Sequence, residues 1–318
     1  MVQHLRLVAA FVAALLAGSA MAQAGVMHIV VPFGAGGVQD ILARAINTEL
    51  GTLLGRSVIV ENRTGAGGTI GTAFVAKAPP DGNTLILSAA SHTIGGSLYA
   101  KLPYDPIADF TPVAHIGTVD YVLMISSAVP AKSVGEFIAY AKANPGKLNY
   151  ASAGNGSATH LSMAYFAGLA GIDMVHIPLK STGDAVNEVV AARSQAVIAA
   201  NIGALPFTRD PRVRMLAMTG AQRSKFLPGL PTIAESGLPD YVFDSWLGLL
   251  GPAGIPKAAV EQVNAAMARL LQEPVILERL ARQGVEPKAM SADAFGALLR
   301  ADFAKMARVV KISGARID

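Results

Sequence analysis

Residues 31–40 read Val-Pro-Phe-Gly-Ala-Gly-Gly-Val-Gln-Asp. The stretch lies between an apolar run that ends at Val31 and an amphipathic pattern of Leu42, Ile46 and Leu50, which predict a strand and a helix. Glycine leaves backbone N–H groups uncovered, and the first turn of a helix adds unpaired donors and the positive end of its dipole. The stretch therefore predicts a small anion cradle that can hold a carboxylate or a phosphate without an arginine.

The alternation of strand and helix continues after this cradle. Residues 57–61 are strand-like, 69–77 helical and 84–88 strand-like again, with a Pro-Pro-Asp-Gly turn at 79–82. A βαβαβ unit forms a parallel sheet, whose ligands bind beyond the carboxyl ends of the strands. The loop at 32–37 and the segment that contains Ser88 and Ser91 are therefore expected on one wall of a cleft.

A second unit begins near Tyr121. Strand patterns cover 122–126 and 148–152, and the helix between them, 133–144, opens on a capping box of Ser133 and Glu136. Ser152 then begins another glycine-rich loop, Ser-Ala-Gly-Asn-Gly-Ser-Ala-Thr-His, which leads into an apolar helix. With one such loop on each lobe, we expect the two lobes to close on a single anion that the loops hold from opposite sides.

The length also indicates two lobes. The first 22 residues carry one fixed positive charge, an apolar run and an Ala-Met-Ala site before Gln23, which predict a secretory signal peptide (residues 1–22) cleaved after Ala22. The remaining 318 − 22 = 296 residues exceed one compact core. Pro228, Pro231 and Thr232 suggest a return crossing. We therefore expect one α/β lobe over 23–120 with 232–318 and another over 121–231.

Composition and motifs exclude several function classes. Without Arg6, 26 − 1 = 25 basic residues face 22 acidic ones, and no stretch is both basic and rich in aromatic residues, so nucleic acid is not an expected partner. The sequence has no cysteine, which excludes disulfides and thiolate metal sites.

Catalytic motifs are missing as well. Residues 150–154 lack the first glycine of a nucleophile elbow, and no His-Glu-x-x-His pattern occurs. The glycine pairs at 34 and 36 and at 65 and 67 lack the third glycine of a dinucleotide fingerprint. We therefore expect no enzymatic activity, no cofactor and no metal.

Several short segments give the chain a resemblance to a known family. They are VPFGAGG followed by Asp40, VENRTGAGG with Ile70 and Gly71, APPDGNTL, LPYDPIADFTPV, KANPGKLNYASAGNGSATHLS, HIPLK, LPTIAESGLP and SWLGLLGPAGIP. In order and spacing they resemble the periplasmic substrate-binding proteins of tripartite tricarboxylate transport systems, the Bug or TctC-type family. The resemblance implies a bilobal periplasmic-binding-protein (Venus-flytrap) fold, with two α/β lobes joined by crossover strands that close on a small carboxylated solute.

The resemblance also implies where the ligand binds. In this family one carboxylate is typically held by backbone groups and ordered waters at two loops rather than by an arginine. By position, these contacts fall on Pro32, Phe33, Ala35, Gly36 and Gly37 in one lobe and on Ser152, Gly154, Gly156 and Ser157 in the other. The predicted ligand-binding set is completed by Asp40, Ser88, Ser91, His160 and Ser181.

Some of these residues have a structural interpretation beside the functional one. Asp40 can cap the first helix or form an ion pair on it instead of contacting the ligand. His160 can hydrogen-bond nearby backbone groups instead of the ligand. The Gly-Ala-Gly-Gly stretch at 65–68 fits a close-packed turn as well as a second anion loop. Trp246, the only tryptophan, is expected in the core or beside the hinge.

The chain also departs from the family pattern. Residues 176–181 read HIPLKS where the family commonly has HVPYKG, and 196–201 read AVIAAN where it often has acidic residues. An acidic residue there could hold a ligand ammonium, so its replacement by alanine argues against an amino-acid ligand and for a roomier, more apolar distal pocket.

These observations predict a monomeric periplasmic receptor for a small mono- or dicarboxylate, which it delivers to a tripartite tricarboxylate-type membrane permease. The alternative is a periplasmic sensor module that binds a similar ligand and signals to a membrane partner.

Overall fold

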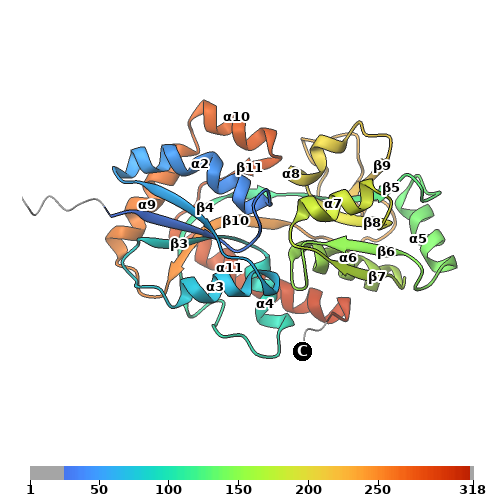
Figure 1. Cartoon of the computed structure of the whole chain (residues 1–318), viewed down its shortest axis with the longest axis horizontal. Coiled ribbons are helices and arrows are strands. Elements are labelled where there is room, and N and C mark those ends of the chain that lie inside the picture. Colours follow the sequence, from blue (N-terminus) through green and yellow to red (C-terminus); the bar gives the residue numbers. More distant parts are fainter. Residues whose placement is uncertain (1–24, 316–318) are drawn as a thin grey trace, which may run out of the picture.

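The computed structural model describes residues 25–315, which form two α/β lobes, each built on its own sheet (Figure 1). The six-stranded sheet has the order β11 (Val285–Pro287), β4 (Phe110–Val119), β10 (Ser245–Pro252), β3 (Thr84–Ala89), β1 (Met27–Val31) and β2 (Val58–Asn62). The five-stranded sheet has the order β7 (Val175–Pro178), β6 (Asn149–Ser152), β8 (Ala196–Ala200), β5 (Tyr121–Ser126) and β9 (Val213–Met218). The expected bilobal α/β fold is confirmed, whereas the expected signal peptide lies outside the described residues.

The first lobe combines a parallel unit with antiparallel strands. β1 pairs in parallel with β2 and β3, as the βαβαβ pattern predicts. β10 runs antiparallel between β3 and β4 and is buried along its whole length, so its sequence lacks the alternation that marks a half-exposed strand. The helices are α2 (Val38–Leu54), η1 (Ala66–Gly68), α3 (Thr69–Ala76), α4 (Ser91–Leu98), α9 (Lys257–Leu270), α10 (Pro274–Arg282) and α11 (Ala292–Ser313).

The second lobe has β6 parallel to β7 and β8, while β5 runs antiparallel to β8 and β9. Its helices are α5 (Val134–Ala143), α6 (Ala158–Ala170), α7 (Thr182–Val190), α8 (Asn201–Ala204) and η2 (Leu205–Phe207). Ser133 caps α5 by accepting a hydrogen bond from the Glu136 N–H at 3.2 Å. The Glu136 carboxylate accepts from the N–H of Lys132 at 2.7 Å, so this cap reaches one residue further back than a standard capping box.

The chain passes between the two sheets at two places. Asp120 alone separates β4 from β5. On the return, between β9 and β10, Met218 forms a parallel bridge with Thr232, and the Phe243 N–H donates to the Thr219 carbonyl at 2.8 Å. The lobe boundaries at 120/121 and 231/232 stay predictions.

The C-terminal helix α11 adds a packed connection between the lobes. It contacts α4 in the first lobe and α6 in the second, and its red end lies below α6 in Figure 1. A Cβ atom at Gly168 of α6 would lie 2.6 Å from the carbonyl oxygen of Ile312, so the two helices approach backbone to backbone there. Within residues 25–315, no helix is long and apolar enough to cross a membrane.

Candidate functional site

A small inner cavity lies where the carboxyl ends of β1, β3 and β6 face each other across the two lobes. Its volume is about 30 Å³, enough for at least one water molecule. It is lined by Phe33, Gly37, Val38, Gln39, Ala89, Ser91, Tyr121, Ala153, Ser157, Ala158, Thr159, Thr182 and Leu247. None of these side chains carries a charge.

Four helices begin at the inner cavity. Lining residues come from the first turns of α2, α4, α6 and α7, two helices from each lobe. The N–H groups of a first turn have no partner within their helix, and the dipole places partial positive charge there. The four N-termini together make the inner cavity favourable for an anion although no arginine or lysine of the described residues lines it.

The first-lobe loop presents bare backbone to the inner cavity. Gly37 is the N-cap of α2 and offers no side-chain cap. Asp40 faces the other way: its carboxylate accepts from the Gly36 N–H at 2.9 Å, from Arg44 Nε at 2.9 Å and from Asn62 Nδ2 at 3.0 Å. Asp40 is buried with these partners and is not among the cavity-lining residues, so the geometry favours its structural interpretation.

The second-lobe loop is held by its own side chains. Ser157 caps α6 by accepting from the His160 N–H at 3.2 Å, and its Oγ lies 3.0 Å from Thr159 Oγ1. Thr159 Oγ1 also accepts from the N–H of Ala153 at 2.8 Å. Ser157 and Thr159 thus shape the loop and line the inner cavity at once.

Two stacked histidines support this loop from behind. The rings of His160 and His176 lie 4.0 Å apart and nearly parallel, with Tyr150 stacked on His176 at 4.9 Å. His160 Nδ1 accepts from the Gly156 N–H at 3.2 Å, and His176 Nε2 lies 2.6 Å from Ser152 Oγ. Burial lowers the pKa of His160 to about 4 and that of His176 to about 3, so both rings are neutral at neutral pH.

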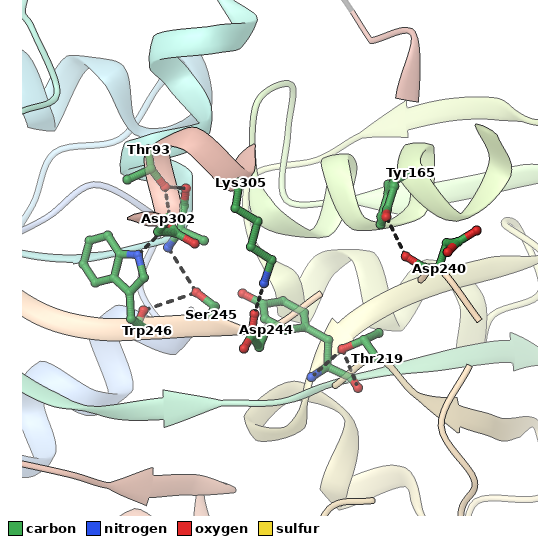
Figure 2. A network of polar contacts seen from close by, with 11 residues as sticks. Thr93, Tyr165, Thr219, Asp240, Asp244, Ser245, Trp246, Asp302 and Lys305 are labelled. Carbon is green, nitrogen blue, oxygen red and sulfur yellow. Dashed lines mark hydrogen bonds and ion pairs between the residues drawn. The ribbon is translucent and has the colours of Figure 1, made fainter. Parts of the chain in front are cut away.

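The hinge side of the inner cavity is fixed by a network of polar contacts (Figure 2). Asp302 of α11 accepts from Thr93 Oγ1 at 2.5 Å and from Trp246 Nε1 at 2.9 Å, which ties α4 to β10. Ser245 Oγ accepts from the Ala90 N–H, next to the start of α4, at 3.0 Å. Trp246 is buried beside these groups, in agreement with its expected place.

Tyr121 lines the inner cavity from the crossover. Its backbone N–H donates to Thr219 Oγ1 at 3.2 Å, which joins the two crossings. Burial raises the pKa of Tyr121 to about 12, so the hydroxyl stays protonated and can donate.

The structure brings together part of the predicted ligand-binding set. Phe33, Gly37, Ser91 and Ser157 line the inner cavity. Pro32 and Gly154 line a neighbouring groove, whereas Ala35 and Gly36 are exposed to solvent. The remaining residues support the walls rather than line the inner cavity: Asp40, Ser88, Ser152, Gly156, His160 and Ser181. Whether each contacts the ligand stays a prediction.

Several lining residues were not predicted. Gln39, Thr159 and Thr182 occupy first turns of helices, and their positions next to the predicted loops are the signal that could have found them. Tyr121 and Leu247 carry no such local signal. Ala196, Ala199 and Ala200, expected at the distal wall, are buried in β8 and do not line the inner cavity.

Within residues 25–315, no group of three or more His, Cys, Asp or Glu side chains is placed to hold a metal ion.

Comparison with known sequences gives one family and several relatives. The family described as "Tripartite tricarboxylate transporter family receptor" matches residues 42–315. The UPF0065 protein in the tcbD-tcbE intergenic region of Pseudomonas sp. (strain P51) is 33% identical over 282 residues, which cover 88% of this chain and 84% of that protein. Protein BugT of Bordetella pertussis is 33% identical over 297 residues, which cover 92% of this chain and 90% of BugT.

Several solved structures are similar to this chain in both fold and sequence. Rpa4515 of R. palustris, solved with adipate, superposes with a TM-score of 0.87 at 33% identity, over 92% of this chain and 98% of that one. The periplasmic binding protein BugD gives 0.86 at 31% identity, with the same coverage of 92% and 98%. MatC from Rhodopseudomonas palustris, solved with bound malate, gives 0.84 at 32% identity, over 90% and 98%.

Proposed function

Since the chain belongs to the family of tripartite tricarboxylate transporter receptors, we propose that it is a periplasmic receptor that binds a small carboxylate between its lobes and delivers it to a membrane permease. The observation that carries this proposal is the inner cavity, where four helix N-termini converge and none of the lining side chains is charged. A carboxylate there gains N–H donors and the favourable ends of four dipoles. Relatives solved with adipate and with malate support the same ligand class.

The lining also bears on what the rest of the ligand carries. An ammonium group needs an acidic side chain or several carbonyl acceptors when it leaves water. Among the described residues no Asp or Glu lines the inner cavity, and its apolar members include Phe33, Ala89 and Leu247. The ligand is therefore a carboxylate without an ammonium group, in preference to aspartate or glutamate.

The positions of the two buried histidines support a receptor role and not a catalytic one. His160 and His176 bind the loop backbone and each other behind the cavity wall. Neither ring is among the lining residues, so neither is placed to take a proton from a bound molecule. Residues 1–22 direct export of the protein, which works as a monomer. When the lobes close over the ligand, the protein takes the form that the permease recognises.

A thermal-shift and calorimetry screen tests the ligand class. We expect plain mono- and dicarboxylates to raise the melting temperature, because they bind the folded state, and amino acids and inorganic phosphate to have little effect. Small-angle scattering with the best acid should show a smaller radius of gyration. Stabilisation by amino acids alone would refute the ligand assignment. Loss of uptake of that acid in a strain lacking this receptor tests delivery, and unchanged uptake contradicts it.

A further inference from the structure

The start of helix α4 has no side-chain cap of its own. Ala90 precedes the helix and offers no side-chain acceptor, and the N–H groups of the first turn have no partner within the helix. Ser91, the first residue of α4, lines the inner cavity, so the direction of this turn decides where its N–H groups and the positive end of the dipole point. The contacts that fix the turn therefore belong to the ligand site, although they lie outside the inner cavity.

Asp302 of α11 provides one of these contacts. Its Oδ2 accepts from Thr93 Oγ1, in the first turn of α4, at 2.5 Å and from Trp246 Nε1, in β10, at 2.9 Å. Figure 2 shows Asp302 between these two donors. The Thr93 hydroxyl also lies 2.9 Å from the Ala90 carbonyl, but it has one proton, and an ionised carboxylate is the stronger acceptor. One oxygen of Asp302 thus joins α4 to β10.

The neighbouring contacts hold Asp302 in place. Three residues further along α11, Lys305 forms an ion pair with Asp244, which directly precedes β10. At the beginning of β10, Ser245 Oγ accepts from the Ala90 N–H at 3.0 Å. The starts of α4 and β10 are therefore joined twice, once directly through Ser245 and once through Asp302 of α11.

The charge of Asp302 does not favour an anionic ligand. The inner cavity suits an anion, and a carboxylate near it repels a ligand of the same sign. Burial, and to a smaller extent the negative charge of Asp302, raises the pKa of Tyr121, which lines the inner cavity, so the field of Asp302 reaches the cavity wall. Any gain in affinity from Asp302 therefore comes from the geometry that its two hydrogen bonds fix.

We propose that Asp302 is a positioning residue of the ligand site: one of its carboxylate oxygens fixes the first turn of α4 against β10 and so holds Ser91 and the helix N-terminus toward the inner cavity. This inference rests on the proposed function, because it concerns the affinity of the same cavity for a carboxylate. Asp302 acts without lining the inner cavity. It links that cavity to α11, the helix that packs against both lobes.

Calorimetry on variants of Asp302 and Thr93 tests this role. The probe is the acid that the wild-type protein binds most tightly among linear mono- and dicarboxylates up to suberate. Asp302→Ala removes the acceptor of both bonds and should weaken binding about tenfold, the lower end for a lost hydrogen bond to a charged group. Thr93→Val lacks only the hydroxyl, leaves the bond from Trp246 in place and should weaken binding about fivefold. It tests the same link even if Asp302→Ala does not fold.

Two further variants separate positioning from other effects. If Asp302 acts through Thr93, the double variant should bind no more weakly than Asp302→Ala alone, because both changes remove the same bond. Asp302→Asn should keep the affinity within about threefold, because Thr93 and Trp246 donate to the same oxygen, and one amide oxygen can accept from both. Binding by Asp302→Asn as weak as that by Asp302→Ala would assign the effect to charge and overturn the inference.

Ser291→Ala is the matched control for damage to α11. Ser291 caps this helix by accepting from the Ala294 N–H at 3.2 Å and lies in a groove between α9 and α11, so the variant should lower the melting temperature and leave the affinity unchanged. An affinity loss in this control equal to that in Asp302→Ala, additive losses in the double variant, or unchanged affinity in both single variants of the pair overturns the inference while the receptor assignment stands. Failure of every carboxylate to bind the wild type overturns the proposed function and this inference with it.

Discussion

The two glycine-rich loops that face each other across the inner cavity are built on different principles. The first-lobe loop enters α2 through Gly37, where no side chain caps the helix. The second-lobe loop enters α6 through Ser157, whose hydroxyl occupies the His160 N–H, and the stacked histidines hold its remaining backbone. In the first loop the Asp40 carboxylate holds the Gly36 N–H but no side chain caps the first turn of α2, whereas in the second loop a serine caps the helix and the histidines hold the rest.

This difference separates two tasks of an anion site. Free N–H groups at the start of a helix supply the attraction for a carboxylate. Internally bonded hydroxyls and rings supply a surface that does not rearrange when the lobes close. We therefore expect changes in the first loop to act on affinity, and changes in the second loop to act on stability and, where the residue also lines the inner cavity, on affinity as well.

The largest effect is expected from Gly37→Asp. Asp is a favourable N-cap residue, and the extended backbone of Gly37 (φ −74°, ψ 167°) suits it, so its carboxylate would take the donors meant for the ligand. Binding of a carboxylate should weaken by about 3 to 5 kcal/mol through charge repulsion in a buried site, with the melting temperature maintained. Calorimetry and thermal unfolding on one sample measure both. Gly37→Asn, of the same shape without the charge, should lose much less.

A smaller effect is expected where the lobes meet. Gly67→Ala places a methyl group 2.1 Å from the Asn155 carbonyl, so it should oppose closure and weaken binding by about 1 to 3 kcal/mol. Gly55→Ala is the control, because Gly55 has a similar φ of 65° but a methyl group there would meet no atom within 4 Å. Equal affinity loss in both variants would show that backbone strain, not closure, is responsible.

The second-loop serines should divide by role. Ser157 lines the inner cavity and caps α6, so Ser157→Ala should cost about 0.5 to 1.5 kcal/mol in ligand affinity as well as some stability. Ser152 bonds His176 and the Gly154 N–H behind the wall, so Ser152→Ala should lower the free energy of unfolding by about 1 to 2 kcal/mol with affinity intact. The reverse pattern would assign the ligand contact to Ser152.

The smallest effect is a pH dependence of stability. The pKa values of His160 and His176, about 4 and about 3, lie below the ordinary value of 6.5, so the unfolded chain binds more protons between these limits. The stabilisation is complete above about pH 6.5 and is lost as the pH falls toward 4, because protonated His160 can no longer accept from Gly156. Melting curves across this range measure it. The double variant His160→Asn, His176→Gln, which keeps neutral hydrogen-bonding groups, should flatten the profile.

Local signals in the sequence were enough to find the two loops and the helices that follow them. Glycine-rich turns between a strand and an apolar helix predict such starts directly, and the βαβαβ order places the first one at a carboxyl edge. Four predicted residues, Phe33, Gly37, Ser91 and Ser157, line the inner cavity for this reason.

The rest of the site depends on pairing between distant segments. Leu247 reaches the inner cavity because β10 lies between β3 and β4 in the sheet, and no local sequence pattern predicts this position of β10. His176 stacks on Tyr150 because these residues are paired in the register of β6 and β7. Tyr121 depends on the crossing at Asp120. Such contacts follow from sheet order, which a single sequence does not specify.

The packing of α11 adds a consequence for how the molecule opens. Because this helix touches α4 in one lobe and α6 in the other, separation of the lobes must break one contact or slide along it. At Gly168 the backbones of α6 and α11 meet, and no side chain at this position interlocks the two helices. Opening of the lobes therefore requires α11 to shift along α4 or α6 as well as a bend at the two crossings, and a larger side chain at position 168 should hinder that shift.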